Sequence, residues 1–438
     1  MSSTVSKSKN VCRPKVLIIS YYWPPAGGPG VQRWVKFAKY LPEFGIDPVV
    51  YVPQNAQYPI VDSEMVSEVS SDVTVLKQNI FEPYQIASFF SRNDTKNISS
   101  GIIPKSENLS LIAKVLLWIR GNVFIPDARI FWVKPSIKFL EKYIVQHNIK
   151  TIITSGPPHS LHLIGLGLKA KLNIKWIADF RDPWTTIGYQ KKLMLTRHSQ
   201  KIHLKLEKQV LQTADQIIVT SHTTKLEFEK ITNKSVHIIT NGFDGEIAFN
   251  ATLDVKFTLA HIGSFLSDRN PQILWQVLAE LTNVNIDFAN CFQLKLIGRV
   301  SQEVLHSIAF YGLSKFVDNR GYLSHSESIT EQKKSQMLLL IEIDSPDTIC
   351  IIPGKLFEYL AANRPIIAIG PKGSDMQEII ENSKAGTFVD YEQKKILKEY
   401  ITECFEKYLH LNLLIKANDV EQFSRKNLTK KLVKIIQI

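Results

Sequence analysis

Short apolar runs alternate with amphipathic stretches along almost the whole chain, and this alternation limits the possible fold more than any other feature. It favours parallel sheets whose strands are joined by crossover helices. The helical pattern is clearest at residues 31–41, where Val31, Trp34, Val35, Ala38 and Leu41 recur at spacings of three and four. We expect strands at 16–20, 49–52, 73–76, 151–154, 176–179, 216–220 and 236–239 in the first half, and at 258–262, 294–297, 337–341, 365–369 and 387–389 in the second half.

The alternation restarts once, after the turn signal Asn241-Gly242 and a polar run at 244–254 that is typical of a linker. A chain of 438 residues also exceeds the size of a single hydrophobic core. The sequence therefore predicts an α/β protein with two doubly wound, Rossmann-like domains, 1–245 and 246–415. Ligands on such sheets bind beyond the carboxyl ends of the strands, so we expect the two domains to face a central cleft.

Several classes of protein are disfavoured by the sequence. No apolar run approaches the roughly 20 residues of a membrane-spanning helix, and the polar, basic start of the chain does not resemble a signal peptide. The four cysteines lie far apart, which argues against a disulfide framework or a zinc site and fits a reducing cytoplasm. The sequence thus predicts a cytoplasmic protein.

The formal net charge of +12 calls for an anionic partner or a solvated basic surface. The lysines are dispersed and no nucleic-acid motif is present, so we do not expect nucleic acid binding. Residues 102–125 mix Leu, Ile, Val and Trp with Lys105, Lys114 and Arg120, as in a helix that lies on a membrane surface, although packing into a core would give the same pattern. Among anionic partners, the sequence favours a membrane surface.

The most informative local motif is Pro353-Gly354-Lys355-Leu356-Phe357-Glu358. A Pro-Gly turn leads into a helix that begins with a cation and carries a carboxylate three residues later. Free N–H groups at a helix N-terminus, together with Lys355, favour a phosphate at Gly354. Glu358 lies one turn further on the same face and can accept hydrogen bonds from a ribose. The motif indicates a nucleotide site.

A glycine-rich loop, Pro24-Pro25-Ala26-Gly27-Gly28-Pro29-Gly30, follows the first predicted strand. It lacks the third glycine of a dinucleotide fingerprint, because Arg33 stands there, and the second strand ends without an acid for a ribose. We therefore reject NAD(P) binding. Gly27 and Gly28 either let backbone amides approach a phosphate or simply form a tight turn.

Charged and aromatic residues follow the next strands of the first half. Asp179-Phe180-Arg181-Asp182 ends a strand that should be buried, so Arg181 and Asp182 are candidate catalytic residues, with an Asp179–Arg181 ion pair as the structural alternative. His159 begins a helix at the end of another strand and is a third candidate. Ser160 beside it could serve as an N-cap.

The second half offers comparable positions. Arg269, just before a helix that Pro271 initiates, is placed to bind a phosphate. Gly298 and Arg299 end another strand and could border the base or phosphate. His261 lies within a strand, and we expect it to be a core or interface residue.

In this order, the motifs resemble those of bacterial GT-B glycosyltransferases of the family 4 (glycosyltransferase group 1) kind, over almost the whole chain. The resemblance implies a nucleotide-sugar donor held mainly by the second domain, with its diphosphate at Arg269, Lys355, Gly354, Gly27 and Gly28, its ribose at Glu358 and its base near Gly298 and Arg299. It implies an acceptor held mainly by the first domain, retention at the anomeric carbon, no metal and no cofactor. Residues 416–438 are similar to the final helix that crosses back to the first domain.

One position departs from the family pattern. Its paired glutamates are eight residues apart, and Cys350 stands where the first should be, which leaves Asp344 and Asp347 as candidates for contacting the donor sugar. The implied reaction adds a sugar to a saccharide or lipid-linked saccharide of a surface polysaccharide (lipopolysaccharide, capsule or exopolysaccharide) at the inner face of the plasma membrane. A sugar-nucleotide epimerase of the same fold and a non-catalytic nucleotide-sugar-binding subunit are the alternatives.

Overall fold

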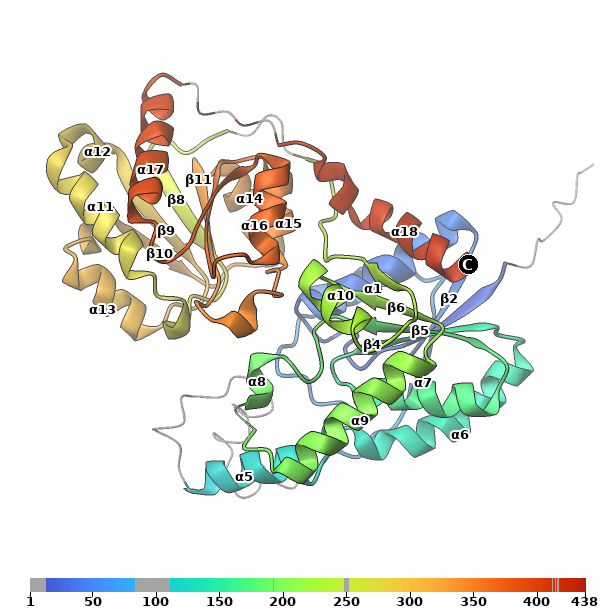
Figure 1. Ribbon diagram of the computed structural model, residues 1–438. Helices are drawn as coiled ribbons and strands as arrows, with labels where there is room; N and C mark the ends of the chain where they lie inside the picture. Colours follow the sequence, from blue (N-terminus) through green and yellow to red (C-terminus); the bar gives the residue numbers. More distant parts are fainter. Residues whose placement is uncertain are drawn as a thin grey trace, which may run out of the picture. The chain divides into compact units, whose positions relative to one another are not determined.

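The computed structural model describes residues 13–82, 111–191, 193–247, 252–411, 413, 415 and 417–438 (Figure 1). The chain divides into two compact units, each described by itself below. The first contains the described residues of Met1–Val219, Glu227–Ile239 and Thr429–Ile438, and the second those of Thr220–Leu226 and Thr240–Leu428. The boundary falls within two helices, α10 (His222–Glu229) and α18 (Arg425–Gln437).

The first unit is built on a seven-stranded sheet in the order β3-β2-β1-β4-β5-β6-β7, with every neighbouring pair parallel. Its strands are β1 (Lys15–Ile19), β2 (Asp47–Pro53), β3 (Thr74–Gln78), β4 (Thr151–Gly156), β5 (Lys175–Phe180), β6 (Gln216–Val219) and β7 (Val236–Ile238). Its helices are α1 (Pro29–Tyr40), α2 (Glu64–Ser67), α5 (Leu111–Asn122), α6 (Ile130–Gln146), α7 (Ser160–Lys171), α8 (Gly188–Lys191) and α9 (Arg197–Thr213).

The second unit repeats this plan with six parallel strands in the order β10-β9-β8-β11-β12-β13. Its strands are β8 (Phe257–Ile262), β9 (Phe292–Ile297), β10 (Val317–Gly321), β11 (Met337–Ile341), β12 (Ile366–Ile369) and β13 (Gly386–Val389). Its helices are α11 (Gln272–Val284), α12 (Ile286–Cys291), α13 (Gln302–Phe310), α14 (His325–Lys334), α15 (Lys355–Ala362), α16 (Asp375–Ser383) and α17 (Lys394–Leu409). Two doubly wound α/β domains, the predicted fold class, are therefore present.

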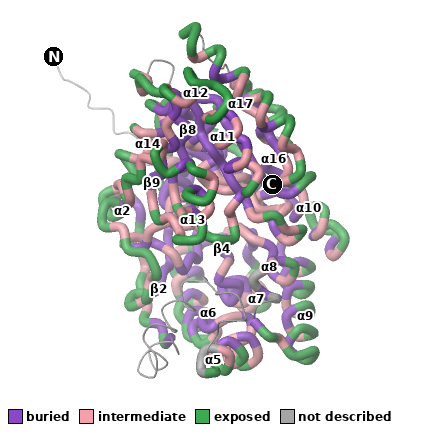
Figure 2. The backbone as a smooth tube through the Cα atoms, turned by 90° about the vertical axis from the view of Figure 1, so that its left-hand side faces the viewer, coloured by how far each residue is buried: buried purple, intermediate pink, exposed green. Residues whose placement is uncertain are grey.

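The central strands are buried because both faces of each sheet carry helices. In the second unit, Leu259 of β8 packs in one core cluster with Trp275 of α11, whereas Ala260 points to the other face and packs with Leu356 of α15. All six residues of β8 are buried, and Figure 2 shows this strand as buried tube. Such two-sided burial explains why the strands are continuous apolar runs in the sequence.

Every predicted strand is present, and the described residues contain one strand that the prediction missed. The missed strand, β10 (Val317-Asp318-Asn319-Arg320-Gly321), has no apolar pattern because it lies at the edge of its sheet and none of its residues is buried. The predicted helix at Val31–Leu41 is confirmed as α1, and its five apolar positions are all at most 1% exposed. None of the helices in the described ranges combines the length and the apolar character needed to cross a bilayer.

Candidate functional site

Both sheets have a switch point, where two neighbouring strands are not consecutive in the chain. In the first unit it lies between β1 and β4, and in the second between β8 and β11. The loops that leave these strands diverge to opposite sides of the sheet, so ligands of doubly wound proteins bind there. The candidate residues of each unit follow these strands or their neighbours.

Lys355, the first residue of α15, reaches back to the end of β8. Its Nζ lies 3.2 Å from Nε2 of His261 and 3.2 Å from the carbonyl oxygen of Ile262. Gly263, whose φ of +116° favours glycine, lies beside the amine, and a Cβ there would be in van der Waals contact with Nζ at 3.5 Å. Burial, followed by the charge of Arg269, lowers the pKa of Lys355 to about 7. An anion at this place would favour the protonated amine.

Arg269 lies at the same end of the sheet and is paired with a carboxylate that we had not singled out. Its Nη2 donates to both oxygens of Glu342, at 3.0 and 3.2 Å, and Glu342, directly after β11, is only 1% exposed. The buried Nε–H of Arg269 has no partner among the described residues. One donor of this guanidinium is thus available to a ligand while Glu342 fixes its orientation.

Glu358 accepts hydrogen bonds from two side chains of α14. His325 Nε2 lies 2.9 Å from one oxygen, and Gln332 Nε2 donates to the other at 3.0 Å. Burial raises the pKa of Glu358, but the bonds from His325 and Gln332 outweigh it and the net pKa is lowered. The group is therefore a carboxylate held in one position, and each oxygen keeps a second lone pair for a hydroxyl.

The other predicted residues of the second unit are positioned by the backbone. Gly298, with φ +113°, packs against Gly263, where a Cβ would approach its carbonyl oxygen to 2.5 Å, so glycine is required there. Arg299 next to it is exposed. Gly354 has helical dihedral angles and directly precedes α15. Asp344 is exposed, whereas Asp347 and Cys350 are partly buried.

A buried ion pair connects the switch-point helix of the first unit with β5. Arg33 of α1 donates to Asp179 at 2.8 Å, and both side chains are at most 1% exposed. Trp34 Nε1 and Ser155 Oγ donate to the second oxygen of Asp179, at 3.1 and 2.7 Å. The alternative of an Asp179–Arg181 ion pair is therefore wrong, because Asp179 is satisfied by α1.

Arg181 instead lies over the glycine-rich loop. Its guanidinium donates to the Pro157 carbonyl and lies 5.7 Å from the ring centre of Tyr22. A Cβ at Gly30 would come within 1.8 Å of Arg181 Nη1, so this glycine makes room for the cation. Gly27 donates to the Ile60 carbonyl, and Gly28 has φ +103° just before α1. The structure thus brings two separate motifs together.

His159 is buried without a polar partner. Its ring is 3% exposed and stacks on Trp184 with centroids 4.8 Å apart, and neither ring nitrogen has a partner in the described part of the chain. Burial, then His162 and Arg181, lowers its pKa well below the usual value, so the ring is neutral. Burial also raises the pKa of Asp182, three residues after Asp179. Ser160 is not an N-cap, since its N–H and Oγ donate to Asp127.

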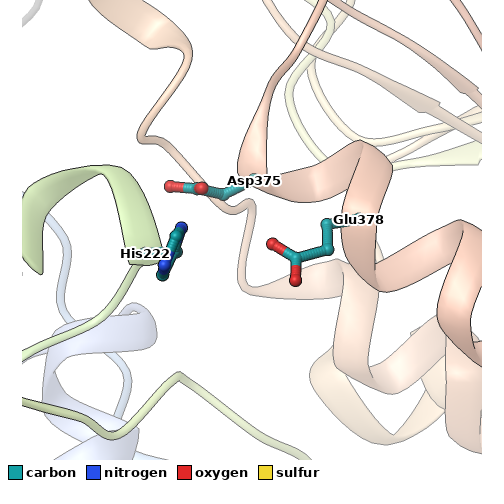
Figure 3. A group of neighbouring side chains, drawn as sticks. All are labelled: His222, Asp375 and Glu378. Carbon is teal, nitrogen blue, oxygen red and sulfur yellow. The ribbon is translucent and has the colours of Figure 1, made fainter. Parts of the chain in front are cut away.

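A group of possible metal ligands lies elsewhere in the second unit, where His222, Asp375 and Glu378 approach one another (Figure 3). Asp375 is buried and accepts from the backbone N–H of Thr223, at 3.1 and 3.2 Å, and from its hydroxyl. Asp375 and His222 each begin a helix, where the helix dipole disfavours a cation. These contacts explain the carboxylate as a helix cap, and the two other side chains are exposed.

The sequence offered a signal for one of the residues that we missed. Glu342 is a charged residue directly after an apolar strand, which is the position from which we selected Arg181 and Asp182. His325 and Gln332 lie on a polar helix with nothing to single them out, and only the folded structure shows their contacts with Glu358.

No protein-family model matches this sequence, and no curated protein does. Solved structures match over the full length. Sucrose-phosphate synthase from Thermosynechococcus elongatus has 15% identity and a TM-score of 0.60 over 97% of this chain and 98% of its own. Anabaena HepE, in complex with UDP-glucose, has 12% identity and a TM-score of 0.59 over 97% and 99%.

The lipopolysaccharide outer core galactosyltransferase WaaB also matches, with 13% identity and a TM-score of 0.57 over 97% of this chain and 99% of its own. At such identities the likeness shows the fold, which is that of the GT-B glycosyltransferases.

Proposed function

We propose that this protein is a glycosyltransferase that moves a sugar from a nucleotide-sugar donor to a saccharide or lipid-linked saccharide of a surface polysaccharide. The observation that carries the proposal is the group at the switch point of the second unit: Lys355, Arg269, whose Nε–H has no partner among the described residues, and the oriented carboxylate of Glu358. These groups match a diphosphate and a ribose. The full-length likeness to sugar-transferring enzymes, including one solved with UDP-glucose, supports it.

The chemistry follows from charge. When the bond between the sugar and the phosphate breaks, negative charge grows on the departing nucleoside diphosphate. Lys355, Arg269 and the N-terminus of α15 would stabilise this charge, and fixed groups of this kind typically lower a barrier by several kcal/mol. Glu358 would bind the ribose hydroxyls. This arrangement needs no metal in the proposed mechanism, and unchanged turnover in the presence of EDTA is the expected result.

In the first unit we assign acceptor-side roles to His159, Arg181 and Asp182. A neutral, buried imidazole with two unused nitrogens suits a sugar hydroxyl. The raised pKa of Asp182 suits a group that exchanges a proton with the attacking hydroxyl. We propose retention at the anomeric carbon, which NMR of the first-formed product would test, since an inverted linkage would reject it.

We further propose that the acceptor is lipid-linked and that the protein works in the cytoplasm at an anionic membrane surface. Leu111, Val115 and Trp118 of α5 are 80%, 57% and 44% exposed and recur at the spacing of one helix face. The opposite face carries Leu117 and Gly121, which pack inside the unit. Residues 102–110 of the segment that predicted this helix lie outside the described part of the chain.

Cations accompany this apolar face. Asn122 at the end of α5 bonds to Met194 and Thr196, which places the basic start of α9 beside it, as Figure 1 shows. Arg197, Lys201 and Lys205 on α9 are all exposed. Exposed apolar side chains next to cations are typical of a helix that binds anionic lipid. The combination supports a bilayer over a neutral protein partner.

Sedimentation with vesicles tests the membrane proposal. We expect binding to vesicles that contain phosphatidylglycerol, little binding to pure phosphatidylcholine, and loss of binding in the Val115→Ser/Trp118→Ser variant. Phe310→Ser removes an apolar residue that is even more exposed, at 83%, from the second unit and should bind like the wild type. Equal binding by both variants would reject this surface.

The proposed activity is tested with a panel of UDP, GDP, ADP and their sugars in a thermal-shift assay, because a ligand of the folded state raises the melting temperature. The best binder is then incubated with and without saccharide acceptors. Donor consumption that requires an acceptor supports a transferase, whereas conversion of the donor alone indicates the epimerase. Binding without either reaction would identify a non-catalytic subunit, and no shift with any nucleotide would overturn the proposal.

A further inference from the structure

His261 is the second-last residue of β8, a central strand of the second sheet, and lies two residues before Gly263. It is 1% exposed, and its ring lies 4.4 Å from the ring centre of Phe265. The ladder between β8 and β11 ends at the pair Ala260–Leu338, one residue before it. An imidazole therefore stands where the sheet opens at its switch point, and an aliphatic side chain would fill this apolar place at lower cost.

The two ring nitrogens have different partners. Nδ1 lies 3.2 Å from the carbonyl oxygen of Leu339 in β11, which can only accept, so this nitrogen carries the proton. Nε2 must then accept, and the group 3.2 Å away is the amine of Lys355. Burial, followed by the charge of Lys355, lowers the pKa of His261 well below its usual value, in agreement with a neutral ring.

These bonds fix the direction of the Lys355 ammonium group. One N–H points to Nε2 of His261 and a second to the Ile262 carbonyl, so the third is directed away from both. A long, flexible lysine would otherwise sample many rotamers, and each rotamer that is excluded before binding reduces the entropy lost when an anion binds.

We propose that His261 is a positioning residue that directs the Lys355 ammonium group toward the diphosphate of the donor. The Leu339 carbonyl holds the imidazole by one hydrogen bond, and the imidazole holds the amine by a second. The inference rests on the proposed nucleotide-sugar site. It differs from the expectation that His261 is a core or interface residue, because one edge of the ring is used for structure and the other for Lys355.

Two substitutions test the two edges of the imidazole ring separately. In His261→Asn the amide nitrogen takes the place of Nδ1 and keeps the bond to Leu339, but nothing reaches Lys355. In His261→Gln the longer side chain brings its amide oxygen to the place of Nε2 and keeps an acceptor for Lys355. We expect His261→Asn to bind the best nucleoside diphosphate of UDP, GDP and ADP about tenfold more weakly, the effect of one hydrogen bond to a charged group, and His261→Gln to bind within about threefold of the wild type.

The same titrations in a Lys355→Ala background complete the test, with melting temperatures measured in parallel. If His261 acts through Lys355, His261→Asn has no further effect on affinity there. Equal affinities of wild type and His261→Asn, or an equal loss with and without Lys355, would overturn the inference while the nucleotide site stands. Absence of nucleoside diphosphate binding by the wild type would overturn the proposed function and this inference with it.

Discussion

The switch points of the two sheets have the same architecture but differ in how their charged residues are paired. In the first unit, Arg33 and Asp179 form a buried ion pair, and neither ring nitrogen of His159, which is neutral, has a partner among the described residues. In the second unit, the cations Lys355 and Arg269 are held by partners that leave part of each one unused. In the proposed function, the first site offers neutral hydrogen-bonding groups such as His159, and the second binds an anion.

This difference indicates how the work would be divided between the units. Burying a cation without a full set of partners is costly, so it is retained where a ligand supplies the missing charge. A sugar acceptor carries hydroxyls and needs orientation more than charge, whereas a nucleoside diphosphate needs both. The predictions below test whether the buried Arg33–Asp179 pair of the first unit is structural and whether the cations of the second unit bind the ligand.

The largest effect is expected from breaking the buried pair of the first unit. Arg33→Ala leaves Asp179 charged and without its cation, which costs about 3–5 kcal/mol of unfolding free energy. Urea denaturation followed by circular dichroism measures the change. Affinity of the folded variant for the nucleotide should stay within about twofold of the wild type, since the effect on stability acts on a different unit.

Arg13→Ala is the matched control. Arg13 also pairs with an aspartate, Asp47, at 3.8 Å, but both side chains are about half exposed. Exposed pairs contribute about 0.5 kcal/mol, so its loss should barely change the denaturation midpoint. If Arg33→Ala were as mild as Arg13→Ala, or if it abolished nucleotide binding, the contrast between the units would fail.

In the second unit the removal of a cation should affect activity and leave the fold intact. Lys355→Ala is expected to reduce transfer by about 10²–10³-fold, the usual loss when one group that stabilises a transition state is removed. Lys315→Ala, an exposed lysine at the amino end of β10, should keep full activity. Full activity of a folded Lys355→Ala protein would reject the assignment of the site.

The sequence predicted the site of the second unit better than that of the first, and the reason is physical. The site of the second unit depends on a contiguous motif, so Lys355 and Glu358 could be named from local spacing. The first site is assembled from loops that meet only in the folded sheet. Arg33 was recognised as a departure from a dinucleotide fingerprint, but its partner, Asp179, is 146 residues away.

The fold itself was largely predictable, because strands that are buried on both faces of a sheet require continuous apolar runs in the sequence. β10, an edge strand with no buried residue, lacks that signal, which is why it was missed. Side-chain partners are harder to predict than strands. The bonds of His325 and Gln332 to Glu358 join two helices and leave no periodic trace.

The state of Lys355 also predicts how affinity varies with pH. With a pKa of about 7 in the free protein, the amine is protonated below that pH and must take up a proton on binding above it. The dissociation constant of a nucleotide sugar, whose phosphodiesters stay ionised, should therefore rise as pH rises above 7, by up to about tenfold per pH unit. Calorimetry across this range measures it. Lys355→Arg stays charged throughout and should flatten the profile, and a flat wild-type profile would contradict the prediction.

The smallest effect is expected at Asp375. A metal site there would contradict the contrast between the two units, because the second unit would then bind a cation as well as an anion. As a helix cap, Asp375 contributes about 1 kcal/mol, so Asp375→Ala should lower the unfolding free energy by that amount. Removing the exposed Glu378 as Glu378→Ala should change nothing. If the three side chains bind a metal, Zn²⁺ or Mn²⁺ raises the melting temperature of the wild type and Glu378→Ala abolishes that rise. We expect no rise, because the N–H and hydroxyl of Thr223 already occupy the carboxylate that a metal would need.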